Sequence, residues 1–352
     1  MTEAVTIEKV EVLDLSDEVE DGDAGFFVGV YAAGHCGWYG PVHADHVNYV
    51  ERYLTHRLIG CSPFEHKKAV EVLCRQPSSL MDQRRRSWAI GTLDCAIWDL
   101  HGKLLNRPVV DLLASHPTTV VPAYGSWLRF DLASADALST VEAVSADGWA
   151  FTKWGLRGEL GDAARLAELA IQVSQSAVNL VAFDALQTWD VDLAVDLCHL
   201  VRRLPIVWIE DPIPYECFRD YRRIAECGVP LSLGEYFTID DERIGQYDLG
   251  QLRALTIDVV GFGGITRVLG LVPLARQLGV MISPHGRSLM PAIHLAAAYS
   301  DVFQSVEYQL QWEPRRQRLY AERCLPTHGE FHVPSTSGLG TTPRRPYARN
   351  RH

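Results

Sequence analysis

From Val120 onward the sequence alternates between short β-forming runs and helical patterns, and this alternation limits the fold more than any other feature. The runs read VVPAYGSW, AFTKW, NLVAFDA, IVWIEDP, LSLGE, ALTIDVVG, VMISPHG and VFQSVEY. A strand followed by a helix about every 25 residues is typical of parallel βαβ units. Eight such runs favour a (β/α)₈-type barrel over an open doubly wound sheet, because no G-x-G-x-x-G motif follows the first run.

The residues before this point mix strand and helix signals without a repeat. Residues 7–13 and 26–33 are rich in β-formers and suit a hairpin, whereas residues 45–58, 65–73 and 84–105 suit helices. In the last of these, apolar residues recur at three- and four-residue steps, which predicts one apolar face. The pattern indicates an α+β domain.

The boundaries follow from these two patterns. We expect the α+β domain to span residues 1–120 and the barrel to span residues 121–323. Residues 324–352 lack the barrel alternation, so we expect them to pack back on the N-terminal domain and to end in a solvated, arginine-rich tail.

Bulk composition narrows the class of partner and the compartment. The formal net charge of −11 disfavours nucleic acid or an anionic membrane as the main partner. The N-terminus is acidic, and no stretch approaches the roughly 18 apolar residues of a membrane span. The eight cysteines have irregular spacing and no C-x-x-C pair, which argues against a zinc cluster or a disulfide scaffold. We expect a cytoplasmic protein with reduced thiols that forms a homo-oligomer.

Seven of the predicted strands end in an ionisable side chain. In chain order these are Lys153, Asp184, Glu210, Glu235, Asp258, His285 and Glu307. The carboxyl-terminal ends of barrel strands share one rim, and active sites of this fold are built there. We therefore expect these side chains to be neighbours in space.

Three carboxylates come from consecutive strands: Asp184, Glu210 and Glu235. The run VWIEDPIP would bury Glu210 at the end of an apolar strand, and an unpaired buried carboxylate is costly. Crowded carboxylates repel one another unless a cation lies among them, and oxygen ligands with open positions point to Mg²⁺ rather than zinc. The alternative is that an individual acid caps a helix or pairs with an arginine.

Lys153 is the last of five lysines, against 28 arginines, and it lies in the apolar run AFTKW. A partly desolvated lysine can lose its proton near neutral pH, which an arginine cannot, so Lys153 is a candidate base. The alternative is a structural lysine whose ammonium group reaches the surface at a strand end.

His285 is the second candidate base. Asp258, on the neighbouring strand end, can accept its ring N–H, fix its tautomer and raise its basicity. The alternative is a loop or capping histidine in SPHG. Two bases beside a divalent cation suit removal of the proton α to a carboxylate, because the cation neutralises the charge of the dianionic enediolate.

The sequence resembles the enolase superfamily, specifically its mandelate racemase-like group, over nearly its whole length. The segments that carry the resemblance are RRRSWAIGTLDCAIWDLHGKLLNRPVVDLL at 84–113, FDA, IEDP, LGE, IDVVGFGGITR, SPHG and VEY. The resemblance implies an α/β fold in which a capping domain, completed by the C-terminal tail, lies over a (β/α)₇β modified TIM barrel. It also implies a small-molecule carboxylate substrate.

The resemblance further implies roles for the rim residues. The residues that resemble the family's Mg²⁺ ligands are Asp184, Glu210 and Glu235. Lys153 resembles the second lysine of the family's K-x-K motif, and Asp258 with His285 resembles its His–Asp dyad. Glu307 resembles the acid that can hydrogen-bond the substrate carboxylate.

Two positions depart from the family pattern. Phe151 stands where the first lysine of K-x-K is expected, so a cation that would tune Lys153 and help bind the carboxylate is missing. Arg157 is a candidate replacement for it. Leu186 stands where the family's D-x-N motif has an asparagine that helps to position the site.

No lysine follows Lys153, which argues against the branches of the family that set two lysines face to face. Relatives with a lysine and a His–Asp pair are mostly acid-sugar dehydratases. We therefore expect a Mg²⁺-dependent dehydratase, a lyase, that acts on a sugar acid or related hydroxy acid, with Lys153 and His285 as base and acid. The alternatives are a racemase or epimerase with the same pair, and a catalytically silent member that binds an acid metabolite.

Substrate choice is expected to lie with the capping domain. The loop GDAGFF and the segment GHCGWYGP at 34–41 are expected to fold over the barrel mouth. His35, Trp38 and Tyr39 are therefore candidate pocket residues, and the alternative for each is a packing role.

Overall fold

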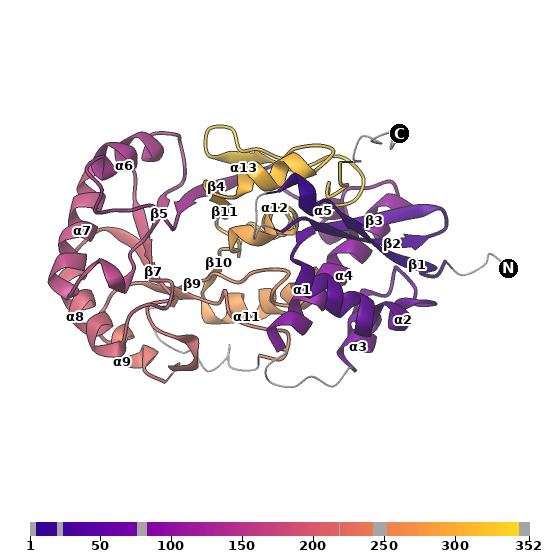
Figure 1. Ribbon diagram of the computed structural model, residues 1–352, viewed down its shortest axis with the longest axis horizontal. Coiled ribbons are helices and arrows are strands. Elements are labelled where there is room, and N and C mark those ends of the chain that lie inside the picture. Colours follow the sequence, from indigo (N-terminus) through magenta and orange to yellow (C-terminus); the bar gives the residue numbers. More distant parts are fainter. Residues whose placement is uncertain (1–4, 20–23, 76–82, 218, 242–251, 345–352) are drawn as a thin grey trace.

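The computed structural model describes residues 5–19, 24–75, 83–217, 219–241 and 252–344. An α+β cap formed by the N-terminal part of the chain lies against one side of a curled parallel sheet (Figure 1). The predicted α/β class, with a cap over an enolase-like TIM barrel, is confirmed. No helix in the described ranges is both long and apolar enough to cross a membrane.

The cap contains a three-stranded antiparallel sheet. Its strands, in the order in which they pair, are β1 (Lys9–Asp14), β2 (Phe26–Ala32) and β3 (His35–Val42). The first two form the hairpin that the sequence predicts. The third strand takes up most of the segment 34–41, which was expected to fold over the barrel mouth and instead pairs with β2.

Helices surround this sheet. They are α1 (Ala44–Tyr49), a π-helical turn (Val50–Leu54), α2 (Thr55–Leu58), α3 (His66–Cys74), α4 (Gln83–Leu104) and α5 (Val109–Leu113). Most residues of α4 are buried on every face of the helix, so the single apolar face expected from the sequence understates its burial. The reason is its position: α4 packs against β2 and β3 of the cap and also against α10 (Ile265–Leu269) of the barrel.

Two aspartates on α4 tie these neighbours together. Asp94 accepts hydrogen bonds from the backbone N–H of Thr266 at 2.9 Å and from its hydroxyl at 2.6 Å. Asp99 accepts from the backbone N–H of Trp38 at 2.7 Å and from that of Leu339 at 2.7 Å. Both carboxylates are fully buried, so each is stabilised by hydrogen-bond donors rather than by water.

The barrel is an eight-stranded parallel sheet, and every strand predicted from the sequence is present. The strands are β4 (Val120–Trp127), β5 (Thr152–Gly155), β6 (Val181–Asp184), β7 (Ile206–Glu210), β8 (Leu231–Leu233), β9 (Leu252–Leu255), β10 (Met281–Ile282) and β11 (Val306–Gln309). They pair in the order β10-β9-β8-β7-β6-β5-β4-β11. At the two ends of this path, the Ile282 N–H of β10 donates to the Val302 carbonyl at 2.9 Å. This bond places β10 beside the residues that precede β11.

Helices cover the outside of this sheet. They are α6 (Ala137–Ser145), α7 (Ala163–Ser176), α8 (Val191–Val201), α9 (Tyr221–Ala225), α10 (Ile265–Leu269), α11 (Leu271–Leu278) and α12 (Leu289–Ala298). The short helix α13 (Glu313–Arg316) follows β11. Short 3₁₀ turns span Ser16–Glu18, Gly158–Leu160, Tyr215–Cys217, Gly286–Ser288 and Gln317–Leu319.

The interior of the barrel is packed with aromatic side chains. Phe151 stacks on Tyr124 with ring centroids 4.3 Å apart and meets Trp208 edge-on at 4.9 Å. All three are buried. The position at which the sequence lacks the family's first lysine is therefore filled by hydrocarbon packing.

The C-terminal segment contacts both halves of the molecule. Strand β12 (Glu330–His332) pairs antiparallel with β4 of the barrel, which the sequence does not predict. Beyond it, the Thr341 hydroxyl donates to the Trp38 carbonyl of the cap at 2.6 Å. Arg344 contacts Glu18, and the rest of the tail predicted to be solvated lies outside the described residues.

Candidate active site

The ends of the barrel strands bring the predicted rim residues into two adjoining groups. Lys153, Asp184, Glu210 and Glu307 form a group with almost no exposure. Glu235, Asp258 and His285 form the second group, and it joins the first where His285 Nε2 lies 3.8 Å from Glu307 Oε2. All seven residues therefore share one rim, as their positions at strand ends predict.

Lys153 lies at the centre of the first group. Its Nζ donates to Glu210 Oε1 at 2.8 Å and lies 3.2 Å from Glu307 Oε1 and 3.5 Å from Asp184 Oδ2. Burial alone would lower the pKa of this ammonium group, but the charges of Glu210 and Glu307 raise it well above its ordinary value. Lys153 is thus a buried cation in this arrangement, and it compensates Glu210 at the end of the apolar strand β7.

Glu210 and Asp184, two of the three carboxylates beside Lys153, accept hydrogen bonds from further donors. Glu210 Oε2 accepts from the Trp208 indole N–H at 3.0 Å and from the Ser232 hydroxyl at 3.3 Å. Asp184 Oδ1 accepts from the Leu186 backbone N–H at 2.8 Å. Burial, and then the charge of Glu210, raise the pKa of Asp184 to about 7. Negative charge at this place is therefore only partly compensated by Lys153.

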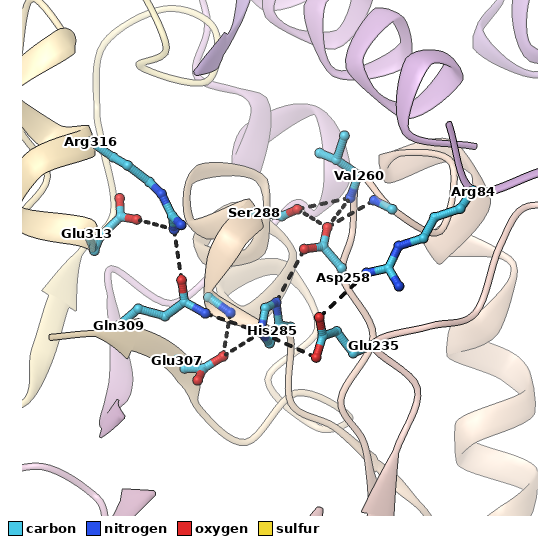
Figure 2. Close-up of polar contacts among 12 residues, drawn as sticks. Arg84, Glu235, Asp258, Val260, His285, Ser288, Glu307, Gln309, Glu313 and Arg316 are labelled. Atoms are coloured by element: carbon cyan, nitrogen blue, oxygen red, sulfur yellow. Dashed lines mark hydrogen bonds and ion pairs between the residues drawn. The ribbon is translucent and has the colours of Figure 1, made fainter. Parts of the chain in front are cut away.

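Glu235 follows β8 and points away from Lys153. Its carboxylate lies 3.8 Å from His285 Nε2 and 3.6 Å from the guanidinium of Arg84 (Figure 2). Across the described part of the chain, no three histidine, cysteine or acidic side chains gather tightly enough to hold a metal ion. Asp184, Glu210 and Glu235 thus lie on neighbouring strand ends without converging on one point.

The chemistry of these three residues nevertheless suits a hard cation. They offer only carboxylate oxygens, which Mg²⁺ prefers. Oδ2 of Asp184 is buried and accepts no hydrogen bond from the described residues. The nearest cation to this oxygen is Lys153 Nζ at 3.5 Å, which makes no hydrogen bond to it, so its charge is only partly compensated and a further cation at this position would be stabilising.

Asp258 and His285 form the predicted dyad. His285 Nδ1 lies 3.4 Å from Asp258 Oδ2, while Asp258 Oδ1 accepts from the backbone N–H groups of Val260 at 3.1 Å and Gly261 at 2.9 Å and from the Ser288 hydroxyl (Figure 2). Burial would raise the pKa of Asp258, but the hydrogen bond and charge of His285 lower it. Asp258 is therefore an ionised group in a fixed orientation.

His285 is surrounded by negative charge. Burial would lower its pKa, but Glu235, Glu307 and Asp258 raise it to about 10. Glu307 accepts from the Gly286 backbone N–H at 2.6 Å, and its own pKa is about 2, because Lys153 and His285 outweigh the effect of burial. Glu307 thus links the lysine and the histidine electrostatically.

A chain of polar contacts that the sequence analysis missed reaches His285 from the last strand. Gln309 Nε2 lies 3.2 Å from His285 Nε2, and Arg316 donates to Gln309 Oε1 at 2.8 Å. Arg316 also lies 3.3 Å from Glu313 (Figure 2). The available signal was spacing, because Gln309 follows Glu307 by two residues and so lies on the same face of β11.

A cavity of about 810 Å³ lies next to this site. Its lining residues are Ala24, His43, Leu128, Arg129, Arg157, Leu186, Thr188, Glu235, Tyr236, His285, Arg287, Gln309, Gln311, Trp312, Arg315 and Arg316. The predicted pocket residue Arg157 is among them. From the loop GDAGFF, Ala24 lines the cavity, and residues 22–23 lie outside the described residues.

Three predicted pocket residues do not line this cavity. His35, Trp38 and Tyr39 belong to β3, so the sheet fixes their places in the cap. His35 is exposed, Trp38 is partly buried, and Tyr39 is buried in the hydrophobic core with its side chain hydrogen-bonded to Ser288 of the barrel. His43, one residue beyond β3, is the cap residue of this region that reaches the cavity.

Comparison with known proteins agrees with this architecture. Residues 136–347 match the family model described as enolase C-terminal domain-like. Residues 27–114 match the N-terminal domain of mandelate racemase and muconate lactonizing enzyme. Together the two matches cover most of the cap and most of the barrel.

Individual relatives are similar over nearly their full lengths. The chain is 26% identical over 365 residues to an L-rhamnonate dehydratase of Saccharopolyspora erythraea, covering 98% of this chain and 88% of that protein. The solved 3,6-anhydro-D-galactonate cycloisomerase of Zobellia galactanivorans superimposes with a TM-score of 0.82 at 23% identity, covering 95% of this chain and 96% of that one.

A second solved structure, a mandelate racemase/muconate lactonizing protein of Paracoccus denitrificans complexed with magnesium, superimposes with a TM-score of 0.80 at 24% identity, covering 97% of this chain and 96% of that one. The family models cover both halves of the chain, and the fold agrees with them. The chain therefore belongs to the mandelate racemase/muconate lactonizing enzyme family of the enolase superfamily.

Proposed function

We propose that this protein is a Mg²⁺-dependent dehydratase of a sugar acid or a related hydroxy acid. The observation that carries the proposal is the convergence of two proton carriers on one carboxylate. Glu307 lies 3.2 Å from Lys153 Nζ through one oxygen and 3.8 Å from His285 Nε2 through the other. Similarity to an L-rhamnonate dehydratase supports this class of reaction.

The residues proposed to hold Mg²⁺ are Asp184, Glu210 and Glu235. When bound, the ion would offset their charge and the negative charge that develops on the substrate carboxylate. Support comes from the all-oxygen donor set, from the buried Asp184 oxygen that accepts no hydrogen bond within the described ranges, and from a related structure complexed with magnesium.

Lys153 and His285 supply the base and the acid in this scheme. Lys153 is a cation in the arrangement described above, because Glu210 and Glu307 raise its pKa. An ion held by Asp184 and Glu210 would offset this negative charge and so favour the neutral lysine. In its neutral form Lys153 takes the proton from the carbon next to the carboxylate, and the electrons of that C–H bond form the enediolate double bond. His285, in its protonated form, gives its proton to the β-hydroxyl, which leaves as water. The resulting enol then rearranges to a 2-keto-3-deoxy acid.

The other residues of the site orient this pair. Asp258 accepts a hydrogen bond from His285 Nδ1, and Gln309 contacts His285 Nε2, so the imidazole ring is held from both sides. The Glu307 carboxylate interacts with both Lys153 and His285 and so couples their charges. The cavity beside His285 is large enough for a sugar acid, because ligand pockets commonly measure about 300–1,000 Å³.

The test is a library of sugar acids incubated with the purified protein in D₂O, with and without Mg²⁺. A dehydratase yields a 2-keto-3-deoxy acid that reacts with semicarbazide, and this product should require the metal. A racemase or epimerase would instead place deuterium on the α-carbon without loss of water, and a silent member would give neither signal with any acid.

Two variants connect the reaction to the site. Lys153→Ala and His285→Asn should each slow turnover by about 10²–10⁴-fold, because a positioned acid or base contributes about that much. Arg276→Gln is the control, since Arg276 is an exposed residue on α11 paired with Asp301 and should leave turnover unchanged. Full activity in the Lys153 and His285 variants would contradict the proposal.

A further inference from the structure

The cavity beside His285 carries an excess of positive charge. Arginines that line it are Arg129, Arg157, Arg287, Arg315 and Arg316. Among the described residues, Glu235 is the one carboxylate in the lining. This concentration is opposite in sign to the chain as a whole, whose formal net charge is −11. A wall of this kind is unfavourable unless an anion occupies it, because like charges repel.

Within the described residues, two of these arginines have no carboxylate partner. Arg287 contacts the Trp88 ring at 5.2 Å from the centroid, and Arg129 contacts the Trp312 ring at 5.7 Å. Neither makes a hydrogen bond or an ion pair within the described parts of the chain. By contrast, Arg157 pairs with Glu159 at 3.1 Å. The cations that remain available are thus the two whose planar faces are supported by aromatic rings.

The two arginines come from different segments of the rim. Arg287 follows His285 by two residues, in the turn Gly286–Ser288 after β10. Arg129 follows the end of β4 by two residues. Burial and then the neighbouring charge of Arg316 lower the pKa of Arg287, which is consistent with guanidinium groups facing a common space.

The reacting end of the substrate already has proposed partners, Lys153 and His285, which are distinct from Arg129 and Arg287. Lys153 is fully buried and is absent from the cavity lining, and Glu307 lies between it and His285. Arg129 and Arg287 line the cavity wall and, within the described residues, contact none of the four buried rim residues. A substrate whose reacting carbon lies at the Lys153–His285 pair would therefore extend its other end along this wall.

We propose that the substrate carries a second anionic group, a carboxylate or a phosphate, which Arg129 and Arg287 bind at the end remote from the reacting carbon. The inference rests on the proposed function, because that function decides which end of the molecule reacts. Guanidinium groups make paired, charge-assisted hydrogen bonds with carboxylate and phosphate oxygens. Sugar diacids and phosphorylated sugar acids share this chemistry.

The experiment compares acids that differ only at the remote carbon. D-gluconate, D-glucarate and 6-phospho-D-gluconate form one matched set, and D-galactonate and D-galactarate form another. Binding to the full chain is measured by isothermal titration calorimetry with Mg²⁺ present. A dianion should bind at least about tenfold more tightly than its monoanionic counterpart, because charge-assisted hydrogen bonds contribute more than neutral ones. Glucarate and 6-phosphogluconate then distinguish a carboxylate from a phosphate.

The arginine variants localise this preference. Arg287→Gln and Arg129→Gln should each reduce the ratio of dianion to monoanion affinity by about 10- to 100-fold. Arg276→Gln, an exposed arginine outside the cavity lining, should leave the ratio unchanged. If no dianion binds more tightly than its monoanion, or if the Arg287 and Arg129 variants keep the full ratio, the inference is overturned.

Turnover of the same acids separates this inference from the proposed function. Suppose that dianions bind selectively but no acid gives a 2-keto-3-deoxy product. This result supports the second anionic group and contradicts the dehydratase proposal. Equal turnover of monoanions and dianions supports the dehydratase proposal and contradicts the second anionic group. Selective turnover of a dianion supports both proposals if the ratio of dianion to monoanion turnover falls in the Arg129 and Arg287 variants.

Discussion

Lys153 Nζ lies 2.8 Å from Glu210 Oε1, and neither side chain is exposed to solvent. A buried ammonium group or a buried carboxylate would be costly by itself, and each removes most of the cost of the other. Strand β7 can therefore end in a charged residue because β5 carries the opposite charge at Lys153. The pair also affects the neighbouring carboxylates, since Asp184 and Glu307 lie close to the same ammonium group.

Removing either member of this pair should destabilise the fold. Lys153→Met should cost roughly 3–5 kcal/mol, because it leaves Glu210 as an uncompensated buried charge. Adding Glu210→Gln should recover part of that loss. A double-mutant cycle from urea unfolding curves measures the coupling, which should exceed about 1 kcal/mol. Additive effects of the two substitutions would show that the pair is not coupled.

Magnesium should stabilise the protein independently of any turnover. A ligand that binds only the folded state adds about 2.7 kcal/mol at 100 times its dissociation constant, so the thermal midpoint should rise with MgCl₂ above a NaCl control of equal ionic strength. Asp184→Asn should abolish the rise. Asp301→Asn, at an exposed carboxylate paired with Arg276, should retain it. Equal shifts in both variants would remove Asp184 from the metal site.

Acid should destabilise the protein through His294. Its Nδ1 accepts from the Val110 N–H at 3.1 Å and its Nε2 donates to the Leu339 carbonyl at 3.2 Å, so the folded state needs the neutral ring. Burial lowers the pKa of His294 from 6.5 to about 4. Below pH 6.5 the unfolded chain binds a proton at His294 that the folded chain does not bind until the pH approaches 4. The stability contributed by the neutral ring is therefore fully present above pH 6.5 and is lost as the pH falls toward 4.

The expected loss from His294 is on the order of 3 kcal/mol at pH 4. Urea unfolding between pH 7 and pH 4.5 measures it, and His294→Gln should flatten the pH dependence by that share. His116→Gln, at an exposed histidine, should leave the slope as it is in the natural chain. A slope that is the same in all three proteins would contradict the neutral state of His294.

Gly91 should tolerate no side chain, although it lies inside a helix. A Cβ at this position of α4 would lie 2.1 Å from the carbonyl oxygen of Val260. Gly91→Ala should therefore cost roughly 2–3 kcal/mol from overpacking, against the stabilisation that alanine normally gives in a helix. Urea unfolding of the purified variant measures this difference.

Gly279 provides the matched comparison, because it has space but an unusual backbone. It ends α11 with φ of 65°, and no atom lies within 4 Å of an added Cβ. Gly279→Ala should cost only about 1–2 kcal/mol, the strain of a left-handed residue. If Gly91→Ala were no worse than Gly279→Ala, the close contact between α4 and Val260 would be relieved by a small shift.

The strands and the shared rim could be predicted because they depend on local features. Each β-forming run that ends in a charged residue places that residue at the carboxyl end of a parallel strand, and the barrel then gathers the ends. The direction of each side chain could not be predicted in this way. Glu235 points toward His285 and Arg84 rather than Lys153, and that choice depends on torsions and on partners distant in sequence.

Strand β3 and the polar contacts of Gln309 were missed for a related reason. The segment HCGWYGPV contains two glycines and a proline, which strands disfavour, and long-range contacts outweigh that preference. One such contact is the hydrogen bond from the Trp38 N–H to Asp99 on α4. Likewise Gln309 gains its role only when the fold places it between His285 and Arg316.

Helix α4 has a consequence for how this architecture can change. Asp94 and Asp99, five positions apart, bind a barrel helix and a cap strand respectively, so one helix joins the cap and the barrel within a continuous hydrophobic core. A cap transplanted from a relative would have to bring its own version of this helix and then match a foreign barrel along its other face. New specificity is therefore reached more readily by altering single residues on the cavity wall than by exchanging whole caps.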